Sequence, residues 1–280
     1  MLPTSIVVYY QNIFLWERMM KRHPFHLVDH SPWPFTSGFG SLFLVSGLVR
    51  WIHGYETFII LSKFGALILG LTIWQWWRDV RREATMQGKH TRKVEVGLRL
   101  GMLLFIVSEI FFFYSFFWAY FHSTLGPRSI VCGYCNTYTV RTINPFHVPL
   151  LNTLLLLGRG SSMTWVHIAV LAHNRAEATL GFAITVSLGA AFTGLQILEY
   201  TQCPFSISDS VYGSSFYLAT GFHGLHVIIG TIFIVVIFTR HLNGHFSARH
   251  HLGLEARAWY WHFVDVIWLF LFICIYWWSY

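Results

Sequence analysis

The sequence predicts an all-α polytopic membrane protein with seven transmembrane helices. Of the 280 residues, 55% are hydrophobic and only 11% are charged, and the mean hydropathy is strongly positive; soluble domains do not have this composition. A hydrocarbon core about 30 Å thick needs roughly 20 apolar residues per helix. Runs of this kind lie near residues 33–52, 57–77, 98–121, 148–172, 180–200, 212–239 and 258–278. Residues 31–280 are therefore predicted to form one seven-helix domain.

The first thirty residues precede these runs. Ile6 to Trp16 is apolar and aromatic but too short to span, and it lacks the basic start and small-residue cleavage site of a signal peptide. Residues 1–30 are therefore predicted as an extension that includes an interfacial segment. Pro32 and Pro34 break the chain where the first span begins, and Trp33 suits the membrane interface.

The Lys and Arg residues predict the orientation of the spans. Most of the 19 basic residues fall in the N-terminal segment and near residues 78–97, 173–179 and 240–257, all on one side of a seven-span protein. Short loops rich in Lys and Arg stay on the side where the protein is made. The N-terminus is therefore predicted to face the cytoplasm or the mitochondrial matrix. The net charge of +7 is a topology signal, and nucleic acid is not an expected partner.

One carboxylate, Glu109, lies within the third apolar run. An ionisable side chain at membrane depth costs about 2.5 kcal/mol or more on insertion scales, so it marks a functional-site hypothesis by default.

Other intramembrane polar residues are predicted to serve packing. His223 and His226 lie one turn apart beside glycines, which favours imidazoles bonded to a neighbouring helix over a metal site. Arg159 needs a carboxylate or carbonyl partner, and Glu109 and Glu199 are the candidates. On the fifth span small residues recur every four positions, which predicts a closely packed face. They are Ala183, Ser187 and Ala191.

No redox centre is predicted on this chain. Cys132 and Cys135 form a Cys-x-x-Cys pair in an outward loop, but a closed zinc site needs four ligands. His122 and His147 flank the loop, so a Cys/His site is conceivable. A disulfide or two idle thiols is the favoured interpretation.

Interfacial tryptophans followed by arginines predict a lipid-headgroup site after the second span. Arg matches phosphate geometry, and basic pockets between spans bind anionic lipid. Topology signalling alone is the alternative. The inward loop near 240–251 carries further Arg and His residues suited to phosphate.

Several long motifs together resemble subunit III of the heme–copper oxidases, and specifically subunit 3 of cytochrome c oxidase. The resemblance covers about Pro24 to the C-terminus in unbroken order. The motifs are Trp74-Gln75-Trp76-Trp77-Arg78-Asp79-Val80, Gln87-Gly88-Lys89-His90, Ser108-Glu109 with Phe116-Phe117-Trp118-Ala119-Tyr120-Phe121-His122, Asn144-Pro145-Phe146-His147-Val148-Pro149-Leu150-Leu151-Asn152-Thr153, Thr220-Gly221-Phe222-His223-Gly224-Leu225-His226-Val227, and Trp259-Tyr260-Trp261-His262-Phe263-Val264-Asp265.

This resemblance implies a non-redox subunit of a proton-pumping oxidase that reduces O2 to water. Hemes and coppers are then held by partner subunits 1 and 2, and this chain binds none. The implied fold is a bundle split by a V-shaped cleft, two helices against five, filled with phospholipids. Accessory subunits and a respiratory supercomplex are further implied partners.

The resemblance also assigns roles to individual residues. Glu109 matches the family carboxylate that reacts with hydrophobic carbodiimides, and it is expected to support proton uptake into subunit 1 without carrying pumped protons itself. His223, His226, His262, Asp265 and Arg159 are expected to be structural polar residues. The expected lipid contacts are Trp77, Arg82, Glu83, His90, Arg240 and His245.

Three features depart from the family pattern, and alternatives stay open. Arg159 stands where small polar or apolar residues are expected, His167 stands alone where paired histidines are common, and the extension lies outside the pattern. A quinol oxidase subunit III shares the fold. A stand-alone proton-coupled transporter would be expected to show inverted repeats, and no internal repeat is evident. The mitochondrial inner membrane is the expected location, with a bacterial plasma membrane as the alternative.

Overall fold

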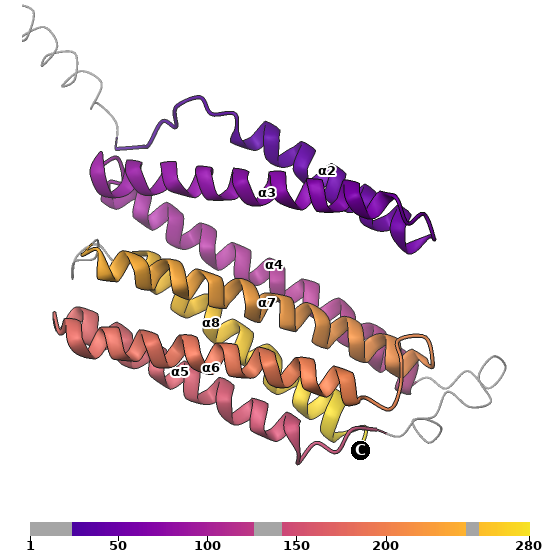
Figure 1. The fold of residues 1–280 in the computed structure, drawn as a ribbon. Coiled ribbons are helices and arrows are strands. Elements are labelled where there is room, and N and C mark those ends of the chain that lie inside the picture. The colour runs from indigo at the N-terminus through magenta and orange to yellow at the C-terminus, as the bar shows by residue number, and fades with distance from the viewer. Residues whose placement is uncertain (1–23, 126–141, 245–251) are drawn as a thin grey trace, which may run out of the picture. The chain divides into compact units, whose positions relative to one another are not determined.

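The computed structural model describes residues 24–125, 142–244 and 252–280, and the regular elements within these ranges are helical (Figure 1). Seven helices are long and apolar enough to cross a membrane, which confirms the all-α prediction with seven spans. They are α2 (Trp33–Ile52), α3 (Phe58–Arg81), α4 (Arg92–Leu125), α5 (Val148–Leu171), α6 (Arg175–Gln202), α7 (Val211–Leu242) and α8 (Leu252–Leu271), with π-helical turns at Arg82–Met86 and Phe272–Trp277. The V-shaped cleft stays a prediction.

Several helices extend beyond the apolar runs that predicted them. α4 has 34 residues and is therefore about 50 Å long at 1.5 Å per residue, well beyond the hydrocarbon thickness. Polar N-caps hold two of the extended ends: the Asn174 side chain accepts from the Glu177 amide at 3.3 Å, and Ser210 accepts from the Gly213 amide at 3.0 Å. Hydropathy detects only the part of a helix within lipid, so it underestimates these lengths.

The chain divides into two compact units, and the boundary in the sequence falls between Leu98 and Arg99. In the first unit, α2 and α3 form a hairpin whose backbones touch. A Cβ atom on Gly47 would lie 2.5 Å from the Ser62 amide nitrogen, and one on Gly65 would lie 2.8 Å from the Gly40 carbonyl oxygen. Small residues permit this approach, and in lipid such close packing holds helices together.

We expect Gly65→Ala to destabilise the hairpin by about 1–3 kcal/mol, because the added methyl group meets backbone atoms that have no rotamer to change. SDS-induced unfolding of the purified chain, followed by tryptophan fluorescence, measures the loss. Gly70→Ala on the same helix is the control, since a Cβ there meets nothing within 4 Å. Equal changes in stability in both variants would show that the backbone contact at Gly65 does not govern the effect.

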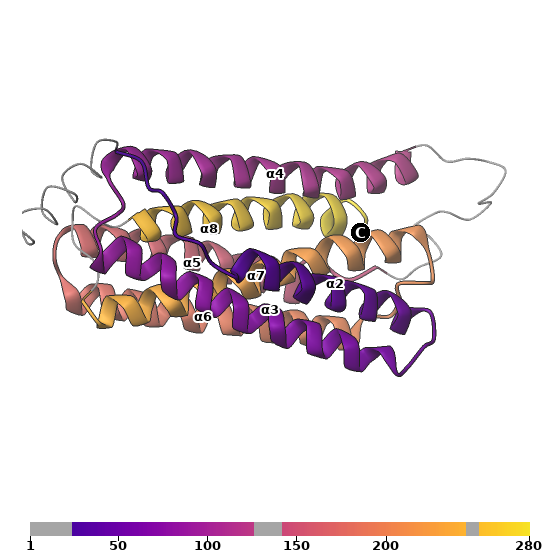
Figure 2. The same ribbon diagram turned by 90° about the horizontal axis from the view of Figure 1, so that it is seen from above.

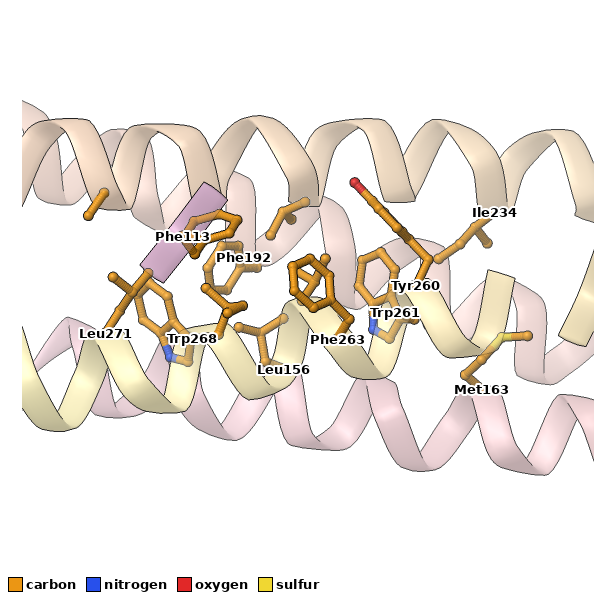
Figure 3. Close-up of a cluster of buried hydrophobic side chains, with 14 of the residues drawn as sticks. Phe113, Leu156, Met163, Phe192, Ile234, Tyr260, Trp261, Phe263, Trp268 and Leu271 are labelled. Atoms are coloured by element: carbon orange, nitrogen blue, oxygen red, sulfur yellow. The ribbon is translucent and has the colours of Figure 1, made fainter. Parts of the chain in front are cut away.

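The second unit is a bundle in which α5 packs beside α6 and α8, and α7 packs between α6 and α8 (Figure 2). Its core is aromatic, and Figure 3 shows Trp261, Trp268 and Phe192 within the row of buried side chains along α8. Trp268 also donates from Nε1 to Thr153 Oγ1 at 2.9 Å, so the buried indole has a polar partner.

The prediction for the packed face of α6 is wrong. Ala183, Ser187 and Ala191 are exposed, whereas Gly181 and Gly189 are buried. Both sets recur at four- or eight-residue spacing, which places each along one side of a helix. Spacing alone does not select which side meets a neighbouring helix.

Candidate functional site

Glu109 meets His226 between α4 and α7, near the middle of both helices. The Glu109 Oε2 and His226 Nε2 atoms are 2.8 Å apart, and the two side chains are 20% and 11% exposed. The other imidazole nitrogen, Nδ1, lies 2.6 Å from the Phe222 carbonyl oxygen. The imidazole is therefore held at both of its nitrogens.

These contacts fix the proton content of the pair. A carbonyl oxygen only accepts, so His226 Nδ1 must carry the hydrogen that it donates to Phe222. Two bare acceptors do not approach to 2.8 Å, so a second proton must lie between Nε2 and Glu109 Oε2. Because separated charges are costly away from water, we expect the neutral arrangement, in which a carboxylic acid donates to a neutral imidazole.

Aromatic side chains enclose the pair. The Phe113 ring centroid lies 5.1 Å from that of His226, and Phe113 is 1% exposed. Phe112 lies 6.2 Å away, and Tyr260 stacks on the imidazole at 6.3 Å with 20° between the planes. These rings offer the pair few polar contacts, so its proton is held in an apolar setting.

Infrared spectroscopy tests this protonation state. We expect a C=O stretching band of a protonated carboxylic acid that disappears in Glu109→Gln and moves to higher frequency in His226→Phe, because the lost hydrogen bond no longer weakens the carbonyl. Glu177→Gln, at the exposed start of α6, is the control and should leave the band intact. Loss of carboxylate bands alone in Glu109→Gln would instead indicate an imidazolium–carboxylate pair.

The other predicted intramembrane residues differ in burial and in the helices that they contact. His223 is 1% exposed and donates from Nε2 to the Val264 carbonyl oxygen on α8 at 3.2 Å. Asp265 is buried and faces the backbone at Gly160. His262, by contrast, is exposed on α8. His223 and His226 thus point to different helices, although they lie one turn apart.

The predicted partners of Arg159 are wrong. Glu109 bonds to His226, and Glu199 accepts a 2.6 Å hydrogen bond from the Tyr276 hydroxyl. Arg159 instead donates to Thr231 Oγ1 at 3.3 Å, and its guanidinium carbon lies 3.5 Å from the ring centroid of Trp261. An aromatic face can hold a buried cation, which sequence reasoning did not consider.

In the first unit, a polar cluster surrounds the end of α3. Trp33 Nε1 donates to Asp79 Oδ2 at 2.9 Å, and Arg78 donates to Oδ1 of the same carboxylate at 3.0 Å. His26 Nε2 lies 3.5 Å from Glu83 Oε2, and the His26 and His90 ring centroids are 5.5 Å apart. Predicted residues Glu83 and His90 are therefore joined through His26.

Trp77 and Arg82, the other two predicted lipid contacts of this unit, have exposed side chains. Arg81 donates to the Trp77 carbonyl oxygen at 3.4 Å and lies over the Trp74 ring at 5.9 Å. Exposed indole and guanidinium groups at a helix end are the chemistry that lipid headgroups require.

Residues 24–30 are tied to the loop after α3, a feature that sequence reasoning missed. Lys89 Nζ donates to Asp29 Oδ2 at 2.8 Å, and Thr91 bonds to the Pro24 carbonyl oxygen. The Lys89 ammonium lowers the pKa of Asp29. The segment has no periodic pattern to indicate these contacts.

Burial is the main cause that lowers the pKa of His90 below its ordinary 6.5; His26 lowers it further, whereas Glu83 and Glu95 oppose the shift. The unfolded chain therefore binds a proton more readily than the folded one. The stability that neutral His90 contributes to the folded chain is complete above pH 6.5 and declines as the pH falls below that value.

We expect faster amide hydrogen exchange in residues 24–32 at about pH 5.5 than at about pH 7.5, after correction for intrinsic rates. The reason is that protonation of His90 destabilises the contact between residues 24–30 and the loop after α3. His90→Gln should abolish the difference. His30→Gln, an exposed position in the same segment, should retain it. Dependence on pH that survives in His90→Gln would contradict this assignment.

Comparison with known proteins agrees with the motifs. The family model for cytochrome c oxidase subunit III matches residues 23–280. The chain belongs to this family. "Cytochrome c oxidase subunit 3" of Anopheles gambiae is 56% identical over 92% of this chain and 97% of its own length. The proteins of the same name from Prototheca wickerhamii and Heterololigo bleekeri are 55% and 53% identical over 93% of this chain, and over 99% and 100% of their own lengths.

Membership of the subunit III family makes the chain one subunit of an oxidoreductase complex. Among residues 24–125, 142–244 and 252–280, no group of three or more His, Cys, Asp or Glu side chains is placed to hold a metal ion. Cys132, Cys135 and His245 lie outside these ranges. Arg240 lies in the last turn of α7, in the second unit.

Proposed function

We propose that this chain is the non-redox subunit III of a proton-pumping cytochrome c oxidase in the mitochondrial inner membrane, with its N-terminus in the matrix. In this role it binds phospholipids, stabilises subunit 1 and supports proton uptake there. Hemes and coppers are assigned to the partner subunits. The observation that carries the proposal is the Glu109–His226 pair at mid-span.

The pair is suited to hold a proton and poorly suited to conduct one. Its two nitrogens and one carboxyl oxygen are already bonded within the unit, and rings of Phe112, Phe113 and Tyr260 surround the imidazole. A relay needs a chain of exchangeable partners on both sides. A protonated acid without such partners favours an accessory role. In this role the protonation state of the pair changes how α4 packs against α7.

Glu109→Gln in the intact complex tests this role. We expect unchanged heme spectra, with less proton uptake or faster inactivation during turnover. The fall in turnover should not exceed about tenfold, or about 1.4 kcal/mol, because no electron transfer step is assigned to this chain. Glu177→Gln is the matched control. Altered heme spectra would contradict the accessory role, and wild-type behaviour in every assay would reduce Glu109 to a packing residue.

The headgroup proposal concerns the end of α3. Arg82 is exposed and cationic, and Trp77 at the end of the same helix is also exposed. The Glu83 carboxylate contacts His26. A phosphate therefore meets the arginine without competition from the nearest acid in sequence. Arg240 and His245 are proposed as further headgroup contacts of the second unit.

We expect Arg82→Gln to reduce the phospholipid retained by the purified complex, measured by native mass spectrometry, because a guanidinium binds phosphate bidentately and an amide does not. Arg50→Gln, the same change near the end of α2, where Arg50 lies 4.7 Å from the Phe58 ring centroid, is the control. Equal lipid content in wild type and Arg82→Gln would overturn the assignment.

A further inference from the structure

Tyr260 of α8 contacts both helices that form the Glu109–His226 pair. Its ring stacks on the His226 imidazole of α7, with the centroids 6.3 Å apart and 20° between the planes. It also stacks on the Phe105 ring of α4, at 6.3 Å and with 21° between the planes. Phe105 lies one turn before Glu109 on the same side of α4. The Tyr260 ring therefore touches the helix faces that carry both members of the pair.

The hydroxyl group of Tyr260 also reaches α7. It donates to the backbone carbonyl oxygen of His226 at 3.4 Å, a long and therefore weak bond for a hydroxyl donor. In Figure 3 the side chain projects from α8 with its hydroxyl oxygen, drawn in red, toward α7. Tyr260 is 5% exposed, so the close-packed side chains around it restrict its motion. Ring contacts therefore give this residue most of its hold on His226.

Gly230 allows Tyr260 to lie this close to α7. It follows His226 by about one turn of the helix. A Cβ atom on Gly230 would lie 3.3 Å from Tyr260 Cε1 and would overlap the Trp261 ring. The backbone of α7 thus lies directly against α8 at this level, and the Tyr260 ring has little room to move away from the imidazole.

The imidazole of His226 needs such a contact to keep its orientation. Rotation about the last side-chain bond of histidine has broad energy wells, so the side chain alone does not set the plane of its ring. The Phe222 carbonyl oxygen holds Nδ1 at 2.6 Å, but one hydrogen bond leaves the ring free to tilt. Glu109 meets Nε2 from a flexible side chain of its own. A nearly parallel aromatic ring limits this tilt and so sets the direction of Nε2.

We propose that Tyr260 is a positioning residue, whose ring holds the His226 imidazole in the plane in which Nε2 meets the Glu109 carboxyl group. This inference rests on the proposed function, because the pair gives Tyr260 its part in proton uptake. It also extends the site to α8, so that three helices set its geometry. A change at Tyr260 therefore alters the Glu109 hydrogen bond through His226.

Infrared spectroscopy of the intact complex measures this positioning. The Glu109 band is the one lost in Glu109→Gln, whether it arises from an acid or a carboxylate. In Tyr260→Leu we expect this band to move in the same direction as in His226→Phe, because a tilted imidazole makes a weaker hydrogen bond. Tyr260→Phe keeps the ring and should leave the band near its wild-type position. An unchanged band in Tyr260→Leu, or equal shifts in both Tyr260 variants, would overturn the proposal.

Tyr212→Leu is the matched control. Tyr212 is a buried tyrosine of the same unit, and its hydroxyl also donates to a backbone carbonyl oxygen of another element, that of Ile275 at 3.2 Å. It lies about four turns before His226 on α7, so its loss should leave the Glu109 band in place. A shift as large as in Tyr260→Leu would indicate a general loosening of the bundle and contradict the proposal.

Phe105→Leu provides the test where Tyr260→Leu does not assemble. Phe105 is 45% exposed, so its replacement should not prevent folding, and it removes the ring on α4 that packs against Tyr260. The Glu109 band should shift in the same direction as in His226→Phe. An unchanged band in this variant would overturn the proposal.

Turnover separates this inference from the proposed function. Proton uptake and inactivation in Tyr260→Leu should resemble those in Glu109→Gln. A shifted band in Tyr260→Leu with wild-type turnover in both variants would support the positioning and remove the proposed function. An unchanged band in Tyr260→Leu with impaired turnover in Glu109→Gln would keep the proposed function and overturn the positioning.

Discussion

The second unit depends on a rule of the lipid environment: a polar side chain away from water must find its partner within the protein. Glu109 shows the consequence, because its contact with His226 joins α4 to α7 at mid-span. Arg99 also joins α4 to α8 through Glu255, and Tyr120 of α4 bonds to Ser279, which follows the π-helical turn after α8. α4 is thus attached by polar and aromatic side chains rather than by close backbone contact.

The two units use different packing. In the first, glycines allow the backbones of α2 and α3 to touch, so the hairpin needs few large buried side chains. In the second, indole and phenyl rings fill the wider space between helices. Trp261 both fills the core and holds a polar group, because it is fully buried and the guanidinium of Arg159 lies over its ring. Aromatic packing here also provides electrostatic stabilisation.

The polar residues of the two units have different surroundings, and this difference fits the functions proposed for them. At the end of α3, Trp33, Asp79, Glu83 and His90 form a cluster beside exposed Trp77. Such an arrangement can exchange protons and ions with the surroundings. Glu109 meets His226 among aromatic rings. One family fold therefore holds a partly exposed polar cluster at a helix end and a half-buried polar pair at mid-span.

The sequence by itself determined the fold class, the seven spans and the family, and it singled out Glu109 as a candidate, because span length and the cost of a buried charge depend on local composition. Only the tertiary structure decided which groups meet. His226 as partner of Glu109, Trp261 as partner of Arg159, and Gly181 in place of Ala183 on the packed face all depend on helix rotation. The spacing of residues along a helix does not change when the helix turns about its own axis. Contacts with neighbouring helices therefore decide which face is buried.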